Sequence, residues 1–414
     1  MNKMKIIDVV CSAGRTGFYF DDQAAIKKGA KNDGLAYVGQ PETKGFSAIR
    51  QPGESISVQL ILEDGQVALG DCAAVQYSGA GGRDPLFLAK DFIPVIEKEI
   101  KPWLVGRDVT EFLDNAKELD NLEHDGKKLH TAIRYGVSQA LLDATAKTNH
   151  ITMAEVIKNE FALTNKIERR PIFTQSGDDR YLNADKMIIK GVEVLPHALI
   201  NHVETKLGKD GSILKEYVEW LRDRIQNIGQ EGYHPNIHLD VYGTIGEAFE
   251  LDTEKQAQYI LELEKTAAPF KLIIEGPMDA GNREDQIKCL AALRARLEEL
   301  DSKVLLVADE WCNTFDDVKA FVDAKAGHIM QIKTPDLGSV HNVAQAIIYC
   351  NERNFGSYVG GTCNETDVSA RATTNVAIAA QASQVLAKPG MGVDEGYMIV
   401  NNEMNRVVAL ANRK

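Results

Sequence analysis

From residue 168 onward the chain alternates short apolar runs with longer amphipathic segments. Segments such as residues 253–265 and 282–300 repeat apolar positions at three- and four-residue spacing, which is typical of helices packed on a core. Strands and helices in alternation predict a parallel sheet, and eight strands predict a (β/α)8 barrel of the TIM type. A doubly wound sheet is the alternative, but no G-x-G-x-x-G motif follows a run. The eight apolar runs are residues 171–174, 194–197, 237–240, 272–275, 304–309, 329–333, 358–362 and 385–387.

The first third of the chain has the mixed pattern of an α+β fold. Residues 55–62 and 67–72 predict two strands, joined by a hairpin turn at Glu63–Gln66. A glycine-rich loop follows at residues 76–85, and residues 129–147 have helical spacing. No proline-rich linker separates the two parts, so we expect them to pack together. The change of pattern predicts an N-terminal α+β capping domain at residues 1–165 and a C-terminal TIM-like barrel domain at residues 166–414.

Composition and charge narrow the function. The 414 residues are 44% hydrophobic and 26% charged, as in soluble globular proteins, and the formal net charge is −13. This charge argues against nucleic acid, whose phosphates demand a basic surface, and against anionic membranes. No apolar stretch approaches the roughly 20 residues of a membrane span, and we expect no signal peptide. The six cysteines are scattered without a C-x-x-C pair, so we expect reduced thiols, no zinc and a cytoplasmic location.

Three successive apolar runs end in a carboxylate, at Asp240, Glu275 and Asp309. The carboxyl ends of barrel strands meet at one rim and carry the catalytic groups, so the three acids should converge there. One acid at such a position is commonly only a solvent-facing residue, but three in succession favour a site. Clustered carboxylates repel one another unless a cation neutralises them, and hard oxygen ligands suit Mg²⁺. Because Glu310 follows Asp309, the sequence leaves open which of the two faces inward.

Other strand ends supply a candidate base and candidate ligands. The next run ends in Lys333, with Gln331 on the same side of the strand. A lysine beside a metal ion should have a lowered pKa and serve as a base, although a lone lysine after a strand is usually a surface residue. His197 ends an early run and should lie across the barrel, although a lone histidine is more often structural. Later in the chain, paired glycines let backbone approach a ligand, and Thr362 with the N–H of Cys363 can bind a carboxylate.

Three acids and a lysine at successive strand ends resemble the enolase superfamily, whose enzymes use a lysine or histidine base with Mg²⁺. Longer motifs resemble one family within it, the methylaspartate ammonia-lyases, and they run nearly from end to end of the chain. These motifs are TGFYFDDQ (16–23), CAAVQYSGAGGRDPLF (72–87), QSGDDRY (175–181), DVYGTIG (240–246), IEGPMD (274–279), ADEWCNT (308–314), QIKTPDLG (331–338), GGTCNET (360–366) and AKPGMGVDEG (387–396).

The resemblance implies a role for each candidate. Asp240, Glu275 and Asp309 would hold Mg²⁺. Lys333 would remove the C3 proton of (2S,3S)-3-methylaspartate, giving an enolate (aci-carboxylate) intermediate and then mesaconate and ammonia. His197, from the opposite side of the barrel, would serve the (2S,3R) epimer, because a base takes only the proton that points at it. The residues predicted to contact the substrate are Gln175, Gln331, Thr362, Cys363, Phe173, Tyr358, Leu386 and Gln76.

The family further implies a small dicarboxylate amino-acid substrate, K⁺ as a monovalent activator, a homodimer and a place in glutamate fermentation. Two other functions stay open. A dehydratase or racemase of the same superfamily usually carries a K-x-K pair on an early strand, where this chain has only His197. An inactive barrel that serves as a binding protein is the second, and the complete set of three acids and Lys333 argues against it.

Overall fold

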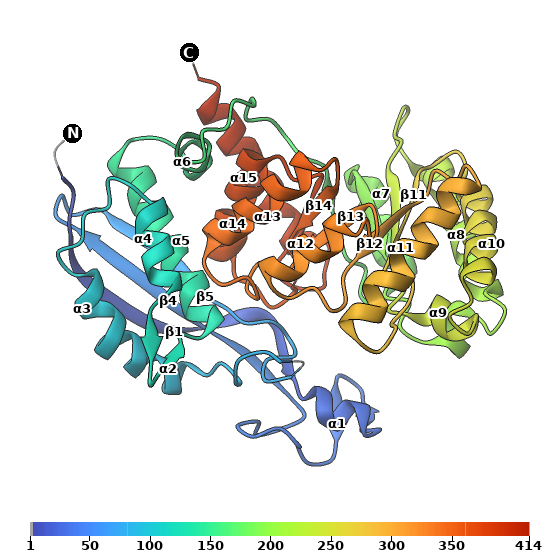
Figure 1. Cartoon of the computed structure of the whole chain (residues 1–414), viewed down its shortest axis with the longest axis horizontal. Coiled ribbons are helices and arrows are strands. Elements are labelled where there is room, and N and C mark those ends of the chain that lie inside the picture. The colour runs from blue at the N-terminus through green and yellow to red at the C-terminus, as the bar shows by residue number, and fades with distance from the viewer. Residues whose placement is uncertain (1–2, 81, 361, 414) are drawn as a thin grey trace.

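The computed structural model describes residues 3–80, 82–360 and 362–413, so Gly81 of the glycine-rich loop and Gly361 of the paired glycines lie outside the described residues. Its first third holds a three-stranded antiparallel sheet in the order β1-β4-β5 (Figure 1). The predicted hairpin is confirmed, because Ile61 pairs with Val67 across the turn. The strands are β1 (Ile6–Asp21), β4 (Arg50–Leu62) and β5 (Val67–Cys72).

Part of this sheet is absent from the prediction. The sequence does not predict β1, which buries only some of its side chains on the core and leaves polar ones in solvent. It also predicts β4 only from Ser55, because Pro52 and Gly53 usually end a strand. These two residues lie where the register between β1 and β4 shifts, so the ladder accommodates them.

The helix α5 (Thr131–Thr148), predicted at residues 129–147, connects the sheet to the second half of the molecule. A Cβ on Gly70 would lie 2.1 Å from the Gly136 carbonyl oxygen, so both glycines are needed for the close contact between β5 and α5. α5 also contacts α13 (Val340–Glu352) and α14 (Asp367–Ala380) (Figure 1). The other elements of this part are α1 (Gln23–Lys27), β2 (Lys31–Asp33), β3 (Ala36–Val38), α2 (Ala89–Val95), η1 (Ile96–Ile100), α3 (Lys101–Leu104), α4 (Leu113–Asp120), β6 (Glu123–His124), β7 (Lys127–Lys128) and α6 (Met153–Glu160).

Eight parallel strands close into a barrel in the order β10-β11-β12-β13-β14-β15-β8-β9. This confirms the predicted (β/α)8 fold and excludes the doubly wound sheet. The strands are β8 (Ile172–Phe173), β9 (Val194–His197), β10 (Asn236–Asp240), β11 (Leu272–Glu275), β12 (Leu305–Ala308), β13 (Ile329–Ile332), β14 (Gly356–Val359) and β15 (Gln384–Leu386).

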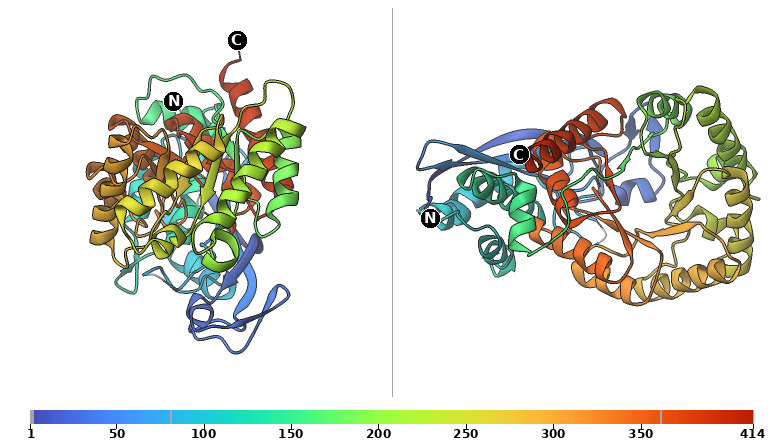
Figure 2. Two further views of the ribbon diagram at one scale, coloured as in Figure 1. Left: turned by 90° about the vertical axis from the view of Figure 1, so that its right-hand side faces the viewer. Right: turned by 90° about the horizontal axis from the view of Figure 1, so that it is seen from above.

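Helices follow one another around the outside of the strands (Figure 2). Inside the barrel a small apolar cluster fills the space below the rim, so the polar residues at the strand ends collect at the rim itself. The outer elements are α7 (Arg180–Lys190), η2 (Val203–Leu207), α8 (Ser212–Ile228), α9 (Thr244–Ala248), α10 (Thr253–Ala267), α11 (Arg283–Glu299), α12 (Phe315–Asp323), α13, α14 and α15 (Asp394–Ala411). The inner cluster is Phe173, Val194, Ile273, Val307, Ile329, Tyr358 and Leu386.

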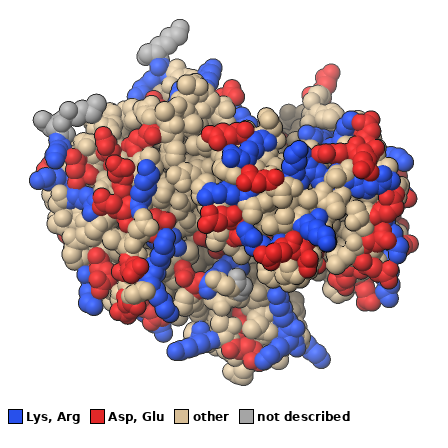
Figure 3. Space-filling view, in the orientation of Figure 1, with Lys and Arg blue, Asp and Glu red and all other residues tan. Residues whose placement is uncertain are grey.

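The outer surface carries charges of both signs. On the face shown in Figure 3, lysine and arginine side chains are interspersed with aspartate and glutamate. Within the described ranges, no helix combines the length and the apolar character that a membrane crossing requires.

Candidate active site at the barrel rim

The three predicted acids meet at the rim. Asp240 ends β10 and pairs in register with Glu275 at the end of β11, and Asp309 directly follows β12. Each offers a carboxylate oxygen within 4.8 Å of the other two. All three are buried, whereas Glu310 is exposed, so Asp309 is the inward-facing member of that pair. We refer to Asp240, Glu275 and Asp309 as the acid cluster.

The electrostatics of the acid cluster fit a divalent cation. Burial, together with the charges of Asp240 and Asp309, raises the pKa of Glu275 well above its usual range. Burial also raises the pKa of Asp240, although the neighbouring His197 opposes this. Two oxygens on one Mg²⁺ lie at most about 4.2 Å apart, so the spacing needs little adjustment to place all three carboxylates on one ion.

Glu275 is held from inside the barrel. The Tyr358 hydroxyl donates a hydrogen bond to its Oε1, and His238 Nε2 lies 3.0 Å from its Oε2, although without the alignment of a hydrogen bond. Burial lowers the pKa of His238, so its ring is neutral, and Gln384 Nε2 lies 2.8 Å from its Nδ1. Phe173 stacks on His238 with ring centroids 4.1 Å apart. Phe173 and Tyr358, which the sequence analysis predicts to contact the substrate, belong to the inner cluster and touch the residues that hold Glu275. The sequence does not single out Gln384.

Lys333 also reaches the acid cluster. Its Nζ lies 2.7 Å from Asp309 Oδ1, and the side chain is buried. Burial alone would lower the pKa of Lys333, but the negative charges of Asp309 and Glu310 outweigh it and the net shift is upward. The lowering expected for a lysine beside a metal ion stays a prediction.

His197 faces Lys333 from the other side of the barrel. β9 and β13 are four strands apart in the closed eight-stranded order, so their ends lie opposite each other. His197 Nε2 lies 3.3 Å from Asp240 Oδ2, and its buried Nδ1 has no hydrogen-bond partner among the described residues. Its backbone has φ of +68°, and Ala198 and Leu199 continue at +71° and +50°. Three such residues in succession support a functional role, because strained backbone clusters at functional sites.

Two glutamines at the rim present free acceptors. The side-chain Oε1 atoms of Gln331 in β13 and Gln175 after β8 are buried without a hydrogen-bond partner in the part of the chain that the structure describes. Because buried polar atoms are normally satisfied, these positions suit a polar ligand.

The N-terminal third contributes Gln76 to the same rim. Gln76 Nε2 donates to Asp21 Oδ2 at 2.6 Å, and Arg50 holds that carboxylate with two hydrogen bonds of 2.7 Å. A carboxylate can only accept, so the Gln76 amide must turn its Oε1 away from Asp21. That oxygen accepts from Cys363 Sγ at 3.7 Å. Burial raises the pKa of Cys363 to about 12, so its thiol remains a donor. Thr362, one residue earlier, is also buried.

The glycine-rich loop is fastened to the barrel by Arg83. Its Nε lies 3.0 Å from Asp336 Oδ2, and its Nη2 donates to Asn313 Oδ1 at 3.2 Å. These two partners follow Lys333 and Asp309 in the chain. The sequence identifies the glycine-rich loop but not the contacts that hold it at the rim. Asp21 and Arg50 fix Gln76, and Arg83 reaches Asp336 and Asn313, across long separations in sequence.

A closed (β/α)8 barrel with three acids and a lysine at its rim, packed against an antiparallel sheet and helix, defines a member of the enolase superfamily. Two family models cover nearly the whole chain, the methylaspartate ammonia-lyase N-terminus over residues 4–162 and the methylaspartate ammonia-lyase C-terminus over residues 164–413. The chain therefore belongs to the methylaspartate ammonia-lyase family and is a carbon–nitrogen lyase. This confirms the resemblance found in the sequence and sets aside the inactive binding protein.

Similar proteins support the same assignment. The chain is 62% identical to methylaspartate ammonia-lyase from Clostridium tetanomorphum and 57% identical to that from Citrobacter amalonaticus, each over 412 residues, 99% of this chain and 100% of the relative. Two solved structures match this chain with a TM-score of 0.97 each. One is the magnesium complex of the Clostridium tetanomorphum enzyme, and the other is the Citrobacter amalonaticus enzyme containing (2S,3S)-3-methylaspartic acid. These matches cover 99% of this chain and 99% or 100% of theirs. Muconate lactonizing enzyme from Pseudomonas fluorescens, at 15% identity and a TM-score of 0.58 over 91% of this chain and 85% of its own, shares the fold alone.

Proposed function

We propose that the chain catalyses the reversible, Mg²⁺-dependent elimination of ammonia from (2S,3S)-3-methylaspartate to mesaconate. The observation that carries this proposal is the acid cluster with Lys333 and His197 on opposite sides of it. The magnesium complex and the methylaspartic acid complex of the two relatives support the choice of cation and substrate.

The acid cluster is the proposed metal site. Asp240, Glu275 and Asp309 would hold Mg²⁺, which supplies positive charge that stabilises the negative charge developing on the substrate carboxylate. The raised pKa of Glu275 supports this assignment, because three buried carboxylates with one lysine lack a matching positive charge.

Lys333 is the proposed base for the (2S,3S) substrate. Its neutral Nζ takes the C3 proton, and the C–H electron pair moves onto the neighbouring carboxylate to give an enolate (aci-carboxylate). When that pair returns to form the C2–C3 double bond, the C2–N bond breaks and ammonia leaves with its electron pair. His197 takes the corresponding proton of the (2S,3R) epimer from the opposite face. Lys333 can act only when the charge of Asp309 is offset, because their ion pair keeps the amine protonated.

Polar side chains at the rim are the proposed substrate ligands. Gln331 would join His197 on the carboxylate next to C3, and Gln175, Thr362 and Cys363 would hold the distal carboxylate and the region of the amine. The partnerless acceptors of the two glutamines support this division. The other proposed contacts are Gln76, Phe173, Tyr358 and Leu386.

Several family properties stay part of the proposal. They are activation by K⁺, a homodimer, a cytoplasmic location, a place in glutamate fermentation, and a division into domains at residues 1–165 and 166–414. The six free cysteines of the described chain support a reducing location.

The test follows mesaconate formation from each epimer, with Mg²⁺ and with a chelator. Lys333→Ala should reduce turnover of the (2S,3S) epimer by at least about 100-fold, as for a lost general base. His197→Ala should mainly reduce turnover of the (2S,3R) epimer and yield product enriched in the (2S,3S) form in the reverse direction. Equal losses on both epimers in both variants would contradict the two-base mechanism, and full activity in chelator would contradict the role of the cation.

A further inference from the structure

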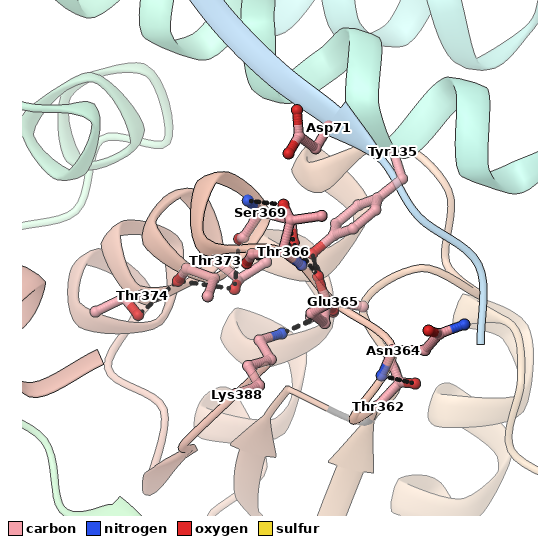
Figure 4. A network of polar contacts seen from close by, with 12 residues as sticks. Asp71, Tyr135, Thr362, Asn364, Glu365, Thr366, Ser369, Thr373, Thr374 and Lys388 are labelled. Carbon is pink, nitrogen blue, oxygen red and sulfur yellow. Dashed lines mark hydrogen bonds and ion pairs between the residues drawn. The ribbon is translucent and has the colours of Figure 1, made fainter. Parts of the chain in front are cut away.

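A second buried ionic group lies in the loops that follow β14 and β15, outside the proposed chemistry. Glu365 and Lys388 form an ion pair with 0% and 1% exposure, and the hydroxyl groups of Tyr135 and Ser369 lie against it (Figure 4). A third hydroxyl group, from Thr334, also contacts both charges. We refer to these five residues as the Glu365 network. Tyr135 comes from α5 of the first third, Ser369 from α14, and the others from loops that follow barrel strands.

Every charged atom of the network is satisfied. Lys388 Nζ donates to Glu365 Oε1 at 3.0 Å and to Thr334 Oγ1 at 3.1 Å. The Thr334 hydroxyl in turn donates to Glu365 Oε1 at 2.8 Å. On the other carboxylate oxygen, Tyr135 donates at 3.0 Å and Ser369 donates as well. Thr334 is thus fixed on two sides by opposite charges.

The network joins the segments that carry the proposed base and the proposed substrate ligands. Thr334 directly follows Lys333; Thr334 contacts Glu365 and Lys388, whereas Lys333 contacts Asp309. Glu365 stands in the loop that also carries Cys363. None of the hydrogen bonds of the network involves β9, the strand that carries His197.

Stability alone does not account for this ion pair. Burying two charges costs about as much as their attraction returns, and apolar side chains of similar volume often serve as well or better. Such a pair does impose one geometry on the groups that it bonds. The Thr334 hydroxyl lies between the two charges, one residue from the proposed base.

We propose that the Thr334 hydroxyl is a positioning group, which Glu365 and Lys388 hold so that the end of β13 presents the Lys333 amine to C3 of the substrate. The inference rests on the proposed two-base function and adds a residue that acts through Lys333. A displacement of a reacting group by about 1 Å can lower turnover about 100-fold, so one hydroxyl can matter.

The test compares three variants in the complete enzyme with Mg²⁺. Thr334→Val removes the hydroxyl and keeps the shape, whereas Thr334→Ser keeps the hydroxyl. Thr374→Val is the matched control, because among the described residues the buried Thr374 hydroxyl donates only to the Ala370 carbonyl in its own helix. For each variant kcat and KM are measured on the (2S,3S) and (2S,3R) epimers, with Lys333→Ala assayed in parallel.

We expect Thr334→Val to lower kcat on the (2S,3S) epimer by about 10- to 100-fold, with a much smaller effect on the (2S,3R) epimer. Thr334→Ser should restore most of this activity, and Thr374→Val should leave the ratio between the epimers unchanged. If Thr334→Val lowers both epimers equally while Lys333→Ala is selective, the positioning role is overturned and the two-base function stands. If Lys333→Ala itself is not selective, the proposed function fails first.

Discussion

The acid cluster and the Glu365 network are both buried at the barrel rim, but their charges differ in balance. The acid cluster sets three carboxylates against the single ammonium group of Lys333. The Glu365 network pairs one carboxylate with one ammonium group, and none of its side-chain oxygens or nitrogens lacks a partner among the described residues.

This difference shows how one fold can place a group suited to binding a ligand and a group that only holds the chain in position at different strand ends. The acid cluster carries more negative than positive charge, and burial with the charges of Asp240 and Asp309 raises the pKa of Glu275. In the Glu365 network the positive and negative charges balance within the chain itself. Removing a charge should therefore have opposite effects on the stability of the metal-free protein at the two places.

The largest effect is expected from breaking the balanced pair. Lys388→Met leaves Glu365 as a buried carboxylate without its counter-charge, which should reduce the free energy of unfolding by about 3–5 kcal/mol. Denaturant unfolding measures this loss. The double variant Lys388→Met with Glu365→Gln removes both charges and should recover most of it. A double variant as unstable as the single one would show that packing, rather than charge, is responsible.

The next effect concerns the cation. Mg²⁺ at about 100 times its dissociation constant should raise the free energy of unfolding by about 2.7 kcal/mol, because it binds the folded state. Thermal unfolding with Mg²⁺ and with a chelator should show this as a shift in Tm. Asp240→Asn should lose the shift, whereas Lys388→Met should keep it despite a lower starting Tm. A full shift in Asp240→Asn would place the cation elsewhere.

The sequence predicts one of these two groups and not the other. Asp240, Glu275 and Asp309 each end an apolar run, so barrel geometry alone brings them together. Glu365 and Lys388 follow their strands by several residues and meet through loops, and Tyr135 reaches them from a helix more than two hundred positions away. No local pattern records such contacts.

Contacts between residues far apart in sequence also explain the other features that the sequence does not predict. The barrel and the β4–β5 hairpin follow from periodicity and turn residues, but β1 contains glycines and exposed polar residues and pairs with a distant strand. Gln76 could be placed near the site by motif, whereas the orientation of its amide depends on Asp21 and Arg50. The pKa of Lys333 depends on the charges of Asp309 and Glu310 around it, which a strand pattern does not specify.

The smallest effect has the opposite sign from the first. Glu275→Gln keeps the acceptor for the Tyr358 hydroxyl, and its amide can donate to His238 Nε2 if the neutral ring changes tautomer and the Gln384 amide turns its oxygen toward Nδ1. It removes one of three mutually repelling charges, so the metal-free variant should be more stable than the natural chain by about 1 kcal/mol, while the stabilisation by Mg²⁺ is lost.

The gain in stability of Glu275→Gln should depend on pH. A carboxyl whose pKa is raised by folding contributes stability that is present below its unfolded pKa and lost as pH rises through the folded pKa. Glu275→Gln lacks this loss, so its advantage in chelator should grow as pH rises above the usual carboxyl range. Unfolding curves at several pH values measure this directly, with Thr374→Val as a neutral control. A metal-free Glu275→Gln that is less stable than the natural chain at every pH would show that the acid cluster is held by its hydrogen bonds, and that it is balanced in the way the Glu365 network is.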